Sequence, residues 1–132
     1  SKMIVNIQIL ISGLICGVIL FQTAIIAPSV FKILKPENAG PFLRSIFPKL
    51  FMFVAFLSSA GLILSLISGT DISIYVYAFS LIFMSICYYI VPMTNQARDS
   101  GDDKTFRNLH TISVVLTMLV LISNLGWMFF LK

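Results

Sequence analysis

The sequence predicts an all-α integral membrane protein, an up-down bundle of four helices. Four runs contain no charged residue and are each long enough to cross a bilayer, because about 20 helical residues span roughly 30 Å of hydrocarbon. These runs are residues 3–31, 50–70, 72–97 and 108–131. The hydrophobic fraction of 58% exceeds the roughly 45–50% of globular proteins. A soluble bundle would also need a charged outer face with a helical period, which segments such as 54–67 lack.

The basic residues predict which side of the membrane each end faces. Cytoplasmic loops are enriched in Lys and Arg, and the opposite side of this chain carries only Lys2 and Lys132. The basic residues of the first and third connections are Lys32, Lys35, Arg44, Lys49, Arg98, Lys104 and Arg107. We therefore expect both termini on the non-cytoplasmic side of a bacterial cytoplasmic (inner) membrane. The basic residues form no dense run, so nucleic acid is not an expected partner.

The first helix is predicted over residues 4–27. We expect it to be retained, because its apolar run exceeds the 7–15 residues typical of a signal-peptide core. Pro28 can kink the helix, which should stop before Pro36 because the residue preceding a proline disfavours the α region. Residues 36–41 are rich in Pro and Gly and predict a turn. Residues 42–47 either lie at the membrane interface or begin the second helix.

The other three helices of this single four-pass domain (residues 1–132) are predicted over residues 48–67, 72–91 and 108–130. A tight turn at 68–71 joins the second helix to the third, which ends at Pro92, and the polar stretch 93–107 predicts a loop. Five aromatic residues with polar tips fall near the helix ends and predict belts at the headgroup level. They are Tyr75, Tyr77, Tyr88, Tyr89 and Trp127.

Close packing at small residues and hydrogen bonds must hold these helices together, because lipid tails are as apolar as leucine. Gly13 and Gly17 form a GxxxG motif, which predicts packing within the chain or against a second copy. Bulk at either glycine should then loosen the bundle. The first and fourth helices are predicted neighbours, joined by polar contacts at two levels. The outer level holds Gln8 and Asn124, and the inner level holds Gln22, Thr23, His110 and Ser113.

His110, the sole histidine, is the candidate for chemistry. It can relay a proton near neutral pH, ligate a metal or haem b, or only cap the fourth helix. A haem site within one chain would need Met84 or Met93 as its second ligand. Cys16 and Cys87 fall inside predicted spans and are interpreted as buried apolar residues. The sequence has no Ser/His/Asp set, intramembrane carboxylate pair or glycine-rich phosphate loop, so we expect a non-enzymatic protein.

The remaining polar residues are predicted to converge at the cytoplasmic mouth of the bundle, since binding sites in bundles form between helices. The predicted pocket is half polar and would hold a lipid headgroup, a small amphiphile or water. Its residues are Gln22, Thr23, Tyr88, Asn95, Arg98, His110 and Ser113.

The order of landmarks resembles a known family. The first helix ends in Ala27-Pro28-Ser29-Val30-Phe31, followed by Leu34 and Ala39-Gly40, and the last loop and helix carry Pro92, Asn95, Arg98, Phe106, His110 and Ser113. This pattern is similar, over nearly the whole chain, to the four-helix membrane family called transmembrane protein 205-like, also described as domain of unknown function 4149. The resemblance implies a four-helix bundle and no settled reaction. It points to Pro28, Phe31, Arg98, Phe106 and His110.

Three classes of function stay open. We expect a binding or transport-related membrane module with its site at the inner mouth. One alternative is a structural subunit or assembly factor of a larger membrane complex. Another is a haem-dependent membrane oxidoreductase using His110, given a distant likeness to haem-carrying proteins of the copper-resistance and protoporphyrinogen-oxidase type, which the missing second membrane histidine weakens. Expected partners are the lipid bilayer, a small amphiphilic ligand, and a second copy or another subunit.

Overall fold

The computed structural model describes residues 1–69 and 72–131 and contains four long helical rods in that part of the chain. The first rod is continuous through three segments, α1 (Lys2–Leu20), the π-helix η1 (Phe21–Ile26) and α2 (Ala27–Ile33). The other rods are α3 (Pro36–Ser68), α4 (Ile72–Asp99) and α5 (Asp103–Gly126), and a 3₁₀ turn, η2 (Trp127–Phe130), follows α5. The predicted all-α four-helix bundle is confirmed.

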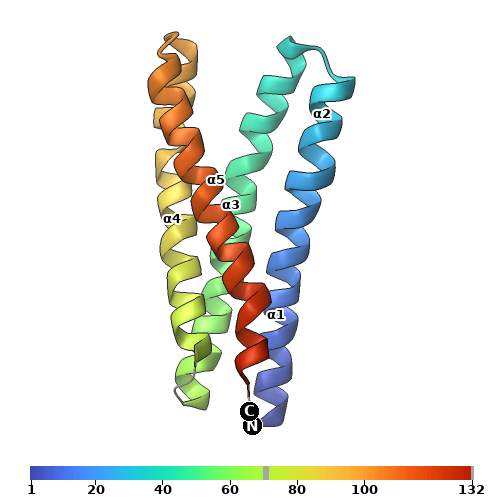
Figure 1. The fold of residues 1–132 in the computed structure, drawn as a ribbon, viewed down its shortest axis with the longest axis vertical. Helices are drawn as coiled ribbons and strands as arrows, with labels where there is room; N and C mark the ends of the chain where they lie inside the picture. Colours follow the sequence, from blue (N-terminus) through green and yellow to red (C-terminus); the bar gives the residue numbers. More distant parts are fainter. Residues whose placement is uncertain (70–71, 132) are drawn as a thin grey trace.

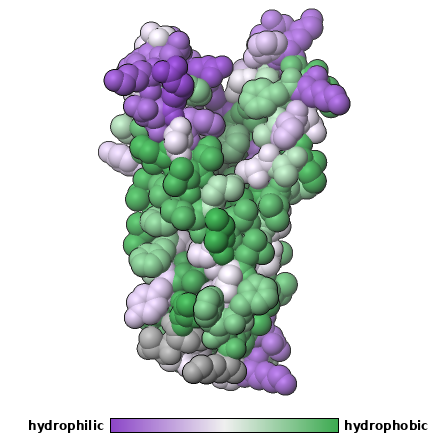
Figure 2. Space-filling view, in the orientation of Figure 1, coloured by the Kyte–Doolittle hydropathy of each residue, from purple (hydrophilic) through white to green (hydrophobic). Residues whose placement is uncertain are grey.

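Neighbouring rods run in opposite directions, so both termini lie at one end of the bundle (Figure 1). We call this the terminal end. The opposite end, which holds the α2–α3 and α4–α5 connections, is called the charged end, because most charged residues gather there (Figure 2). At the charged end the Arg44 guanidinium donates two hydrogen bonds to the Asp99 carboxylate and thereby ties α3 to α4.

All four rods are long and apolar enough to cross a membrane. Large apolar side chains cover the outside of the bundle, with Phe56 69% exposed and Ile122 64% exposed, and they form the broad apolar band in Figure 2. Such a surface cannot face water over this area without aggregation. The protein is therefore an integral membrane protein; which side its termini face remains a prediction.

The π-helix η1 lies just before Pro28. Proline has no N–H to donate to the carbonyl four residues earlier, and a local π turn is one of the adjustments by which membrane helices accommodate it. The first helix then ends at Ile33. Leu34 and Lys35 are extended, as the residue before a proline prefers, so the predicted stop before Pro36 is confirmed.

The helices at the charged end are longer than predicted. No turn occupies residues 36–41, because Pro36 starts α3 at a position where a helix needs no N–H donor, and α3 continues through Pro41 and Pro48. Similarly, α4 passes through Pro92 instead of ending there. Membrane helices tolerate such prolines, and a helix need not end where the hydrocarbon does.

The predicted loop 93–107 is only Ser100–Asp102. Gly101, at φ +76°, ends α4 in a left-handed conformation. The Asp102 N–H donates to the Ala97 carbonyl and the Gly101 N–H to the Arg98 carbonyl, which is the pattern of a Schellman motif. Asp102 then caps α5 by accepting from the Thr105 N–H at 3.2 Å. Of the predicted turn at 68–71, residues 70 and 71 lie outside the described residues.

A buried group of polar residues joins all four rods towards the terminal end. We call it the polar layer, and it comprises Gln8, Ser12, Ser65, Ser73, Tyr77, Ser80, Asn124 and Trp127. Gln8 Nε2 donates to Ser65 Oγ at 2.9 Å and to Ser73 Oγ at 3.3 Å, which ties α1 to α3 and α4. The Tyr77 hydroxyl donates to the backbone carbonyl of Gln8 at 2.6 Å.

The same layer ties α5 to α1 and α4. Ser12 Oγ donates to Asn124 Oδ1 at 2.9 Å, and Asn124 Nδ2 donates to Ser80 Oγ at 2.9 Å. Trp127 Nε1 donates to Ser12 Oγ at 2.8 Å. A polar contact thus joins the first and fourth helices at the outer level, but it is made by Ser12 and Asn124, whereas Gln8 bonds to α3 and α4. Each bond avoids leaving a polar group unpaired in hydrocarbon.

Two aromatic predictions need correction. Tyr77 (0% exposed) and Trp127 (2% exposed) lie in the core rather than in an interfacial belt, and their rings meet edge to face at 6.2 Å. Tyr75 and Tyr89 are exposed, as a belt requires. The ring of Tyr77 packs directly on Gly61, where an added Cβ would lie 2.5 Å from Tyr77 Cε1.

Candidate functional site

The seven residues of the predicted inner-mouth pocket do not come together. His110 is exposed, and its ring stacks on Phe106 at 5.8 Å. The Arg98 guanidinium lies 4.7 Å from the centre of the same Phe106 ring. These three side chains form a surface cluster that joins the end of α4 to the start of α5, and this cation–π and stacking arrangement explains them as parts of the helix connection.

The other members of that predicted pocket are dispersed. Thr23 donates to the Ile19 carbonyl of its own helix, and the Ser113 carbonyl accepts from Thr117. Tyr88 is exposed and Asn95 half-buried, both on α4. Within residues 1–69 and 72–131, the hydrogen bonds of Thr23 and Ser113 therefore do not pair the first and fourth helices at the inner level. Of the seven residues, Gln22 lines a groove between two helices.

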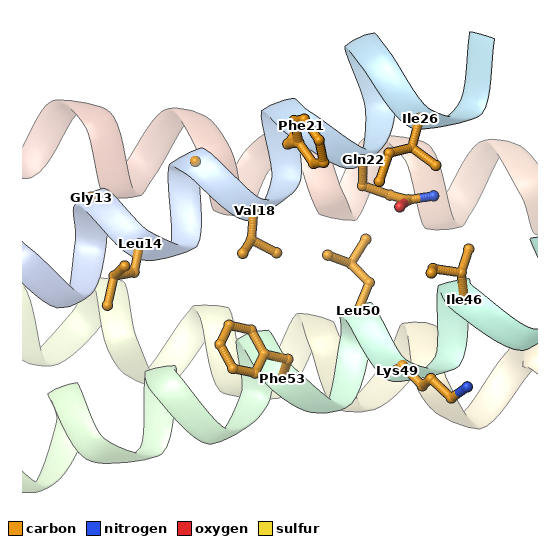
Figure 3. A pocket seen from close by; sticks show the side chains of 11 residues that line it. Gly13, Leu14, Val18, Phe21, Gln22, Ile26, Ile46, Lys49, Leu50 and Phe53 are labelled. Carbon is orange, nitrogen blue, oxygen red and sulfur yellow. The ribbon is translucent and has the colours of Figure 1, made fainter. Parts of the chain in front are cut away.

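A groove of about 620 Å³ runs between the first rod and α3. Its walls are almost wholly apolar, and Leu14, Phe21 and Phe53 are exposed along it, so the groove opens on the lipid-facing surface. The lining residues are Gly13, Leu14, Gly17, Val18, Phe21, Gln22, Ile26, Ile46, Lys49, Leu50 and Phe53 (Figure 3).

Gly13 and Gly17 form part of this groove and do not pack against another helix of the chain. Both are exposed, and a Cβ added at either would meet no atom within 4 Å. The structure therefore gives no reason to expect that bulk at these glycines loosens the bundle. The close approach of helices occurs at Gly61 instead. Hydropathy could not have distinguished the two sites, since both glycines and their surroundings are apolar.

Gln22 is the polar group inside the groove. It is only 4% exposed, and its Nε2 has no hydrogen-bond partner among the residues that the structure describes. Figure 3 shows the amide directed into the space between the two helices, towards the end of the groove marked by Ile26 and Ile46. A buried amide without a partner costs roughly 1–3 kcal/mol, so an acceptor delivered by a ligand would be stabilised there.

Lys49 supplies the positive charge at the same end of the groove (Figure 3). Its ammonium group donates to Ser45 Oγ at 3.1 Å, and within residues 1–69 and 72–131 no carboxylate pairs with it. Arg44, the nearest other cation on α3 in sequence, is already paired with Asp99. The groove thus combines apolar walls, one unpartnered donor and one cation without a carboxylate partner.

The residues present do not fit a haem. His110 lies exposed at the charged end and does not line the groove. Met84 is fully buried in the core and Met93 is exposed, and neither lines the groove. In the described part of the chain, no group of three or more His, Cys, Asp or Glu side chains is arranged to hold a metal ion. Cys16 and Cys87 are buried and unpaired thiols, as predicted.

The fold and groove define a small four-helix integral membrane protein with a lipid-facing groove. The chain belongs to the family described as Domain of unknown function (DUF4149), which matches residues 10–103. This range contains every groove-lining residue and Arg98 but ends before Phe106 and His110. The match does not test the transmembrane protein 205-like name. No curated protein and no solved structure matches the sequence.

Proposed function

We propose that this protein is a non-enzymatic binding module that holds one amphiphilic molecule in the groove between the first rod and α3. The observation that carries the proposal is the unpartnered amide of Gln22 at one end of an otherwise apolar cavity. Ligand sites are mostly apolar with a few placed polar groups and have volumes of about 300–1,000 Å³, and this groove has both properties.

The direction of entry follows from the exposed walls. Leu14, Phe21 and Phe53 place the opening on the lipid-facing surface, so a ligand would enter sideways from the bilayer. The proposed site is therefore suited to molecules that already reside in the membrane. It differs in place from the expected pocket at the mouth, with which it shares only Gln22.

The local backbone supports the same site. Gln22 is the second residue of η1, and single π turns inside α-helices occur frequently at functional sites. The π turn sets the direction of Gln22 relative to the α-helical residues before it.

Native mass spectrometry of the protein released from lipid nanodiscs tests the proposal. The wild type should retain one amphiphile, and Gly17→Leu should lose it, because a Cβ at position 17 has no atom within 4 Å and the larger leucine side chain would occupy groove space. Ala24→Leu is the matched control, since Ala24 is exposed on the same rod and does not line the groove. Equal retention in the wild type and Gly17→Leu, or no retention in either, would contradict the proposal.

A structural role is the second candidate, favoured by the exposed Gly13 and Gly17 stripe, because small residues spaced in this way let a second helix approach closely. Under this alternative a helix of another chain occupies the groove. Gly17→Leu would then change the mass of the assembly rather than the amount of bound amphiphile. The same spectra therefore separate the two functions.

A further inference from the structure

Building on the proposed function, we infer that the groove recognises a glycerophospholipid. One acyl chain lies along Gly13 and Gly17, an ester carbonyl accepts a hydrogen bond from Gln22 Nε2, and the phosphate pairs with Lys49. Each of the three parts rests on a separate property of the groove.

Depth is the first property. Gln22 lies 20 residues after Lys2, which is about 30 Å at 1.5 Å per residue, and this equals the usual hydrocarbon thickness. On α3, Lys49 is the last charged residue before the charge-free residues 50–68. Both side chains line the same end of the groove. They therefore lie at the boundary between hydrocarbon and headgroups, where phospholipid esters reside.

The hydrogen-bonding capacity of Gln22 is the second property. Its Nε2 is a donor without a partner, buried among apolar walls. A carbonyl oxygen satisfies it, because a carbonyl accepts and brings no further donor to be satisfied. At this depth the ester carbonyls are the acceptors that a phospholipid offers.

Charge is the third property. The Lys49 ammonium has three N–H donors, one of which Ser45 accepts. The carboxylate of Asp99 is held by Arg44, and Lys49 has no carboxylate partner in the described residues. The Lys49 side chain is directed away from Gln22 in Figure 3, so it would turn towards a phosphate placed above an ester bound to Gln22 and act as its counter-charge.

The apolar part of the groove matches one leaflet. Gly13 and Gln22 are nine residues apart, which is about 14 Å along the helix, close to half of the roughly 30 Å hydrocarbon. The glycines leave room for a methylene chain beside the helix, since no atom lies within 4 Å of either missing Cβ. Lipid chemistry therefore fits the groove from its glycine end to its charged end.

Competition between two synthetic lipids tests the Gln22 contact. Ester-linked phosphatidylglycerol and its ether-linked analogue have the same headgroup and chains. The ester lipid has carbonyl acceptors and the ether lipid has none. By native mass spectrometry the wild type should prefer the ester lipid about fivefold, as one hydrogen bond provides. Gln22→Met should bind both equally. The control Thr23→Val, which alters only a bond within the helix, should keep the preference.

A second competition tests the phosphate contact. The wild type should prefer phosphatidylglycerol over diacylglycerol with the same chains, and Lys49→Gln should lose this preference. Lys35→Gln is the control, because Lys35 is exposed at the same end of the molecule and does not line the groove. Thermal unfolding in detergent checks that each variant folds.

The outcomes separate this inference from the proposed function. If the wild type retains an amphiphile that Gly17→Leu expels but does not distinguish ester from ether, the phospholipid inference is wrong and the binding module stands. A preference that persists in Gln22→Met also overturns the inference. If no lipid is retained and Gly17→Leu alters only the oligomeric mass, a second copy occupies the groove and both proposals are wrong.

Discussion

At the scale of the residue, two kinds of glycine in this chain have opposite roles. Gly61 lies against the Tyr77 ring, whereas Gly13 and Gly17 face open space. The sequence favoured the GxxxG pair as the packing motif, because spacing is visible in a sequence and the direction of a helix face is not. For the same reason Tyr77 and Trp127 were expected at the interface, although their hydroxyl and indole N–H lie in the polar layer.

Gly61→Ala should destabilise the protein by about 1–3 kcal/mol, the usual cost of overpacking. The added methyl group would lie within 2.6 Å of two carbon atoms of the buried Tyr77 ring, and Tyr77 is held by its bond to the Gln8 carbonyl. Gly17→Ala, which meets no atom, is the matched control. Thermal or denaturant unfolding in detergent measures both; equal stabilities would contradict the packing described.

Asn124→Leu should lower stability by about 1 kcal/mol, since interhelical hydrogen bonds in membranes average about 0.6 kcal/mol each and Asn124 makes two, with Ser12 and Ser80. Ser85→Ala is a suitable control, because Ser85 is exposed and bonds only within its helix to the Leu81 carbonyl. A leucine variant as stable as the wild type would show that the polar layer contributes little to stability.

At the scale of the element, the helices were predictable in number and type but not in length. Hydropathy marks where a helix crosses hydrocarbon, and so it reports nothing of the turns that extend α3 back to Pro36 or α4 on to Asp99. Those ends are set by local chemistry, by Pro36 at the start of α3 and by Gly101 and Asp102 between α4 and α5. The sequence shows that Gln22 is polar, but hydropathy does not report the π turn in which it lies.

The cap of α5 should make the stability of the protein depend on acid pH. Hydrogen bonds from Thr105 hold the pKa of the Asp102 carboxylate below its usual value. The largest effect comes from the Thr105 side chain and the next from its backbone N–H. A group with a lowered folded pKa stabilises the fold above its unfolded pKa and loses this effect as pH falls through the folded pKa. The loss should therefore begin below about pH 4.

Asp102→Asn isolates this contribution, because asparagine caps helices as well as aspartate does and does not titrate. The melting temperature of the wild type, measured relative to Asp102→Asn, should fall as pH is lowered below 4, whereas the two should stay parallel between pH 6 and 8. If the melting temperatures of the wild type and Asp102→Asn changed equally down to pH 2, the cap would have no electrostatic role.

At the scale of the whole molecule, the bundle places charge and polarity at different heights. The charged end holds most ionic groups (Figure 2). The polar layer is buried towards the terminal end, and the groove opens on the lipid-facing surface between the first rod and α3. The four-pass architecture followed from the charge-free runs, because a charged side chain at the centre of a membrane helix is costly. The groove could not be predicted from these runs, because it depends on how two rods diverge.

The distribution of Lys and Arg predicts that the charged end faces the cytoplasm. Ser100→Cys, in the α4–α5 connection, should react with a membrane-impermeant thiol reagent only in inverted vesicles. Lys2→Cys, near the N-terminus, should react only in right-side-out cells. The native Cys16 and Cys87 are buried and should remain silent in both. The opposite labelling pattern would reverse the predicted topology.

A high-resolution structure of the protein in lipid nanodiscs tests the central claim, the binding of a lipid in the groove, most directly. We expect continuous density for a single acyl chain beside Gly13 and Gly17, ending in a headgroup within hydrogen-bonding distance of Gln22 Nε2 and close to Lys49. A groove filled by a helix of a neighbouring copy, or one no better ordered than the lipid around the rest of the bundle, would contradict it.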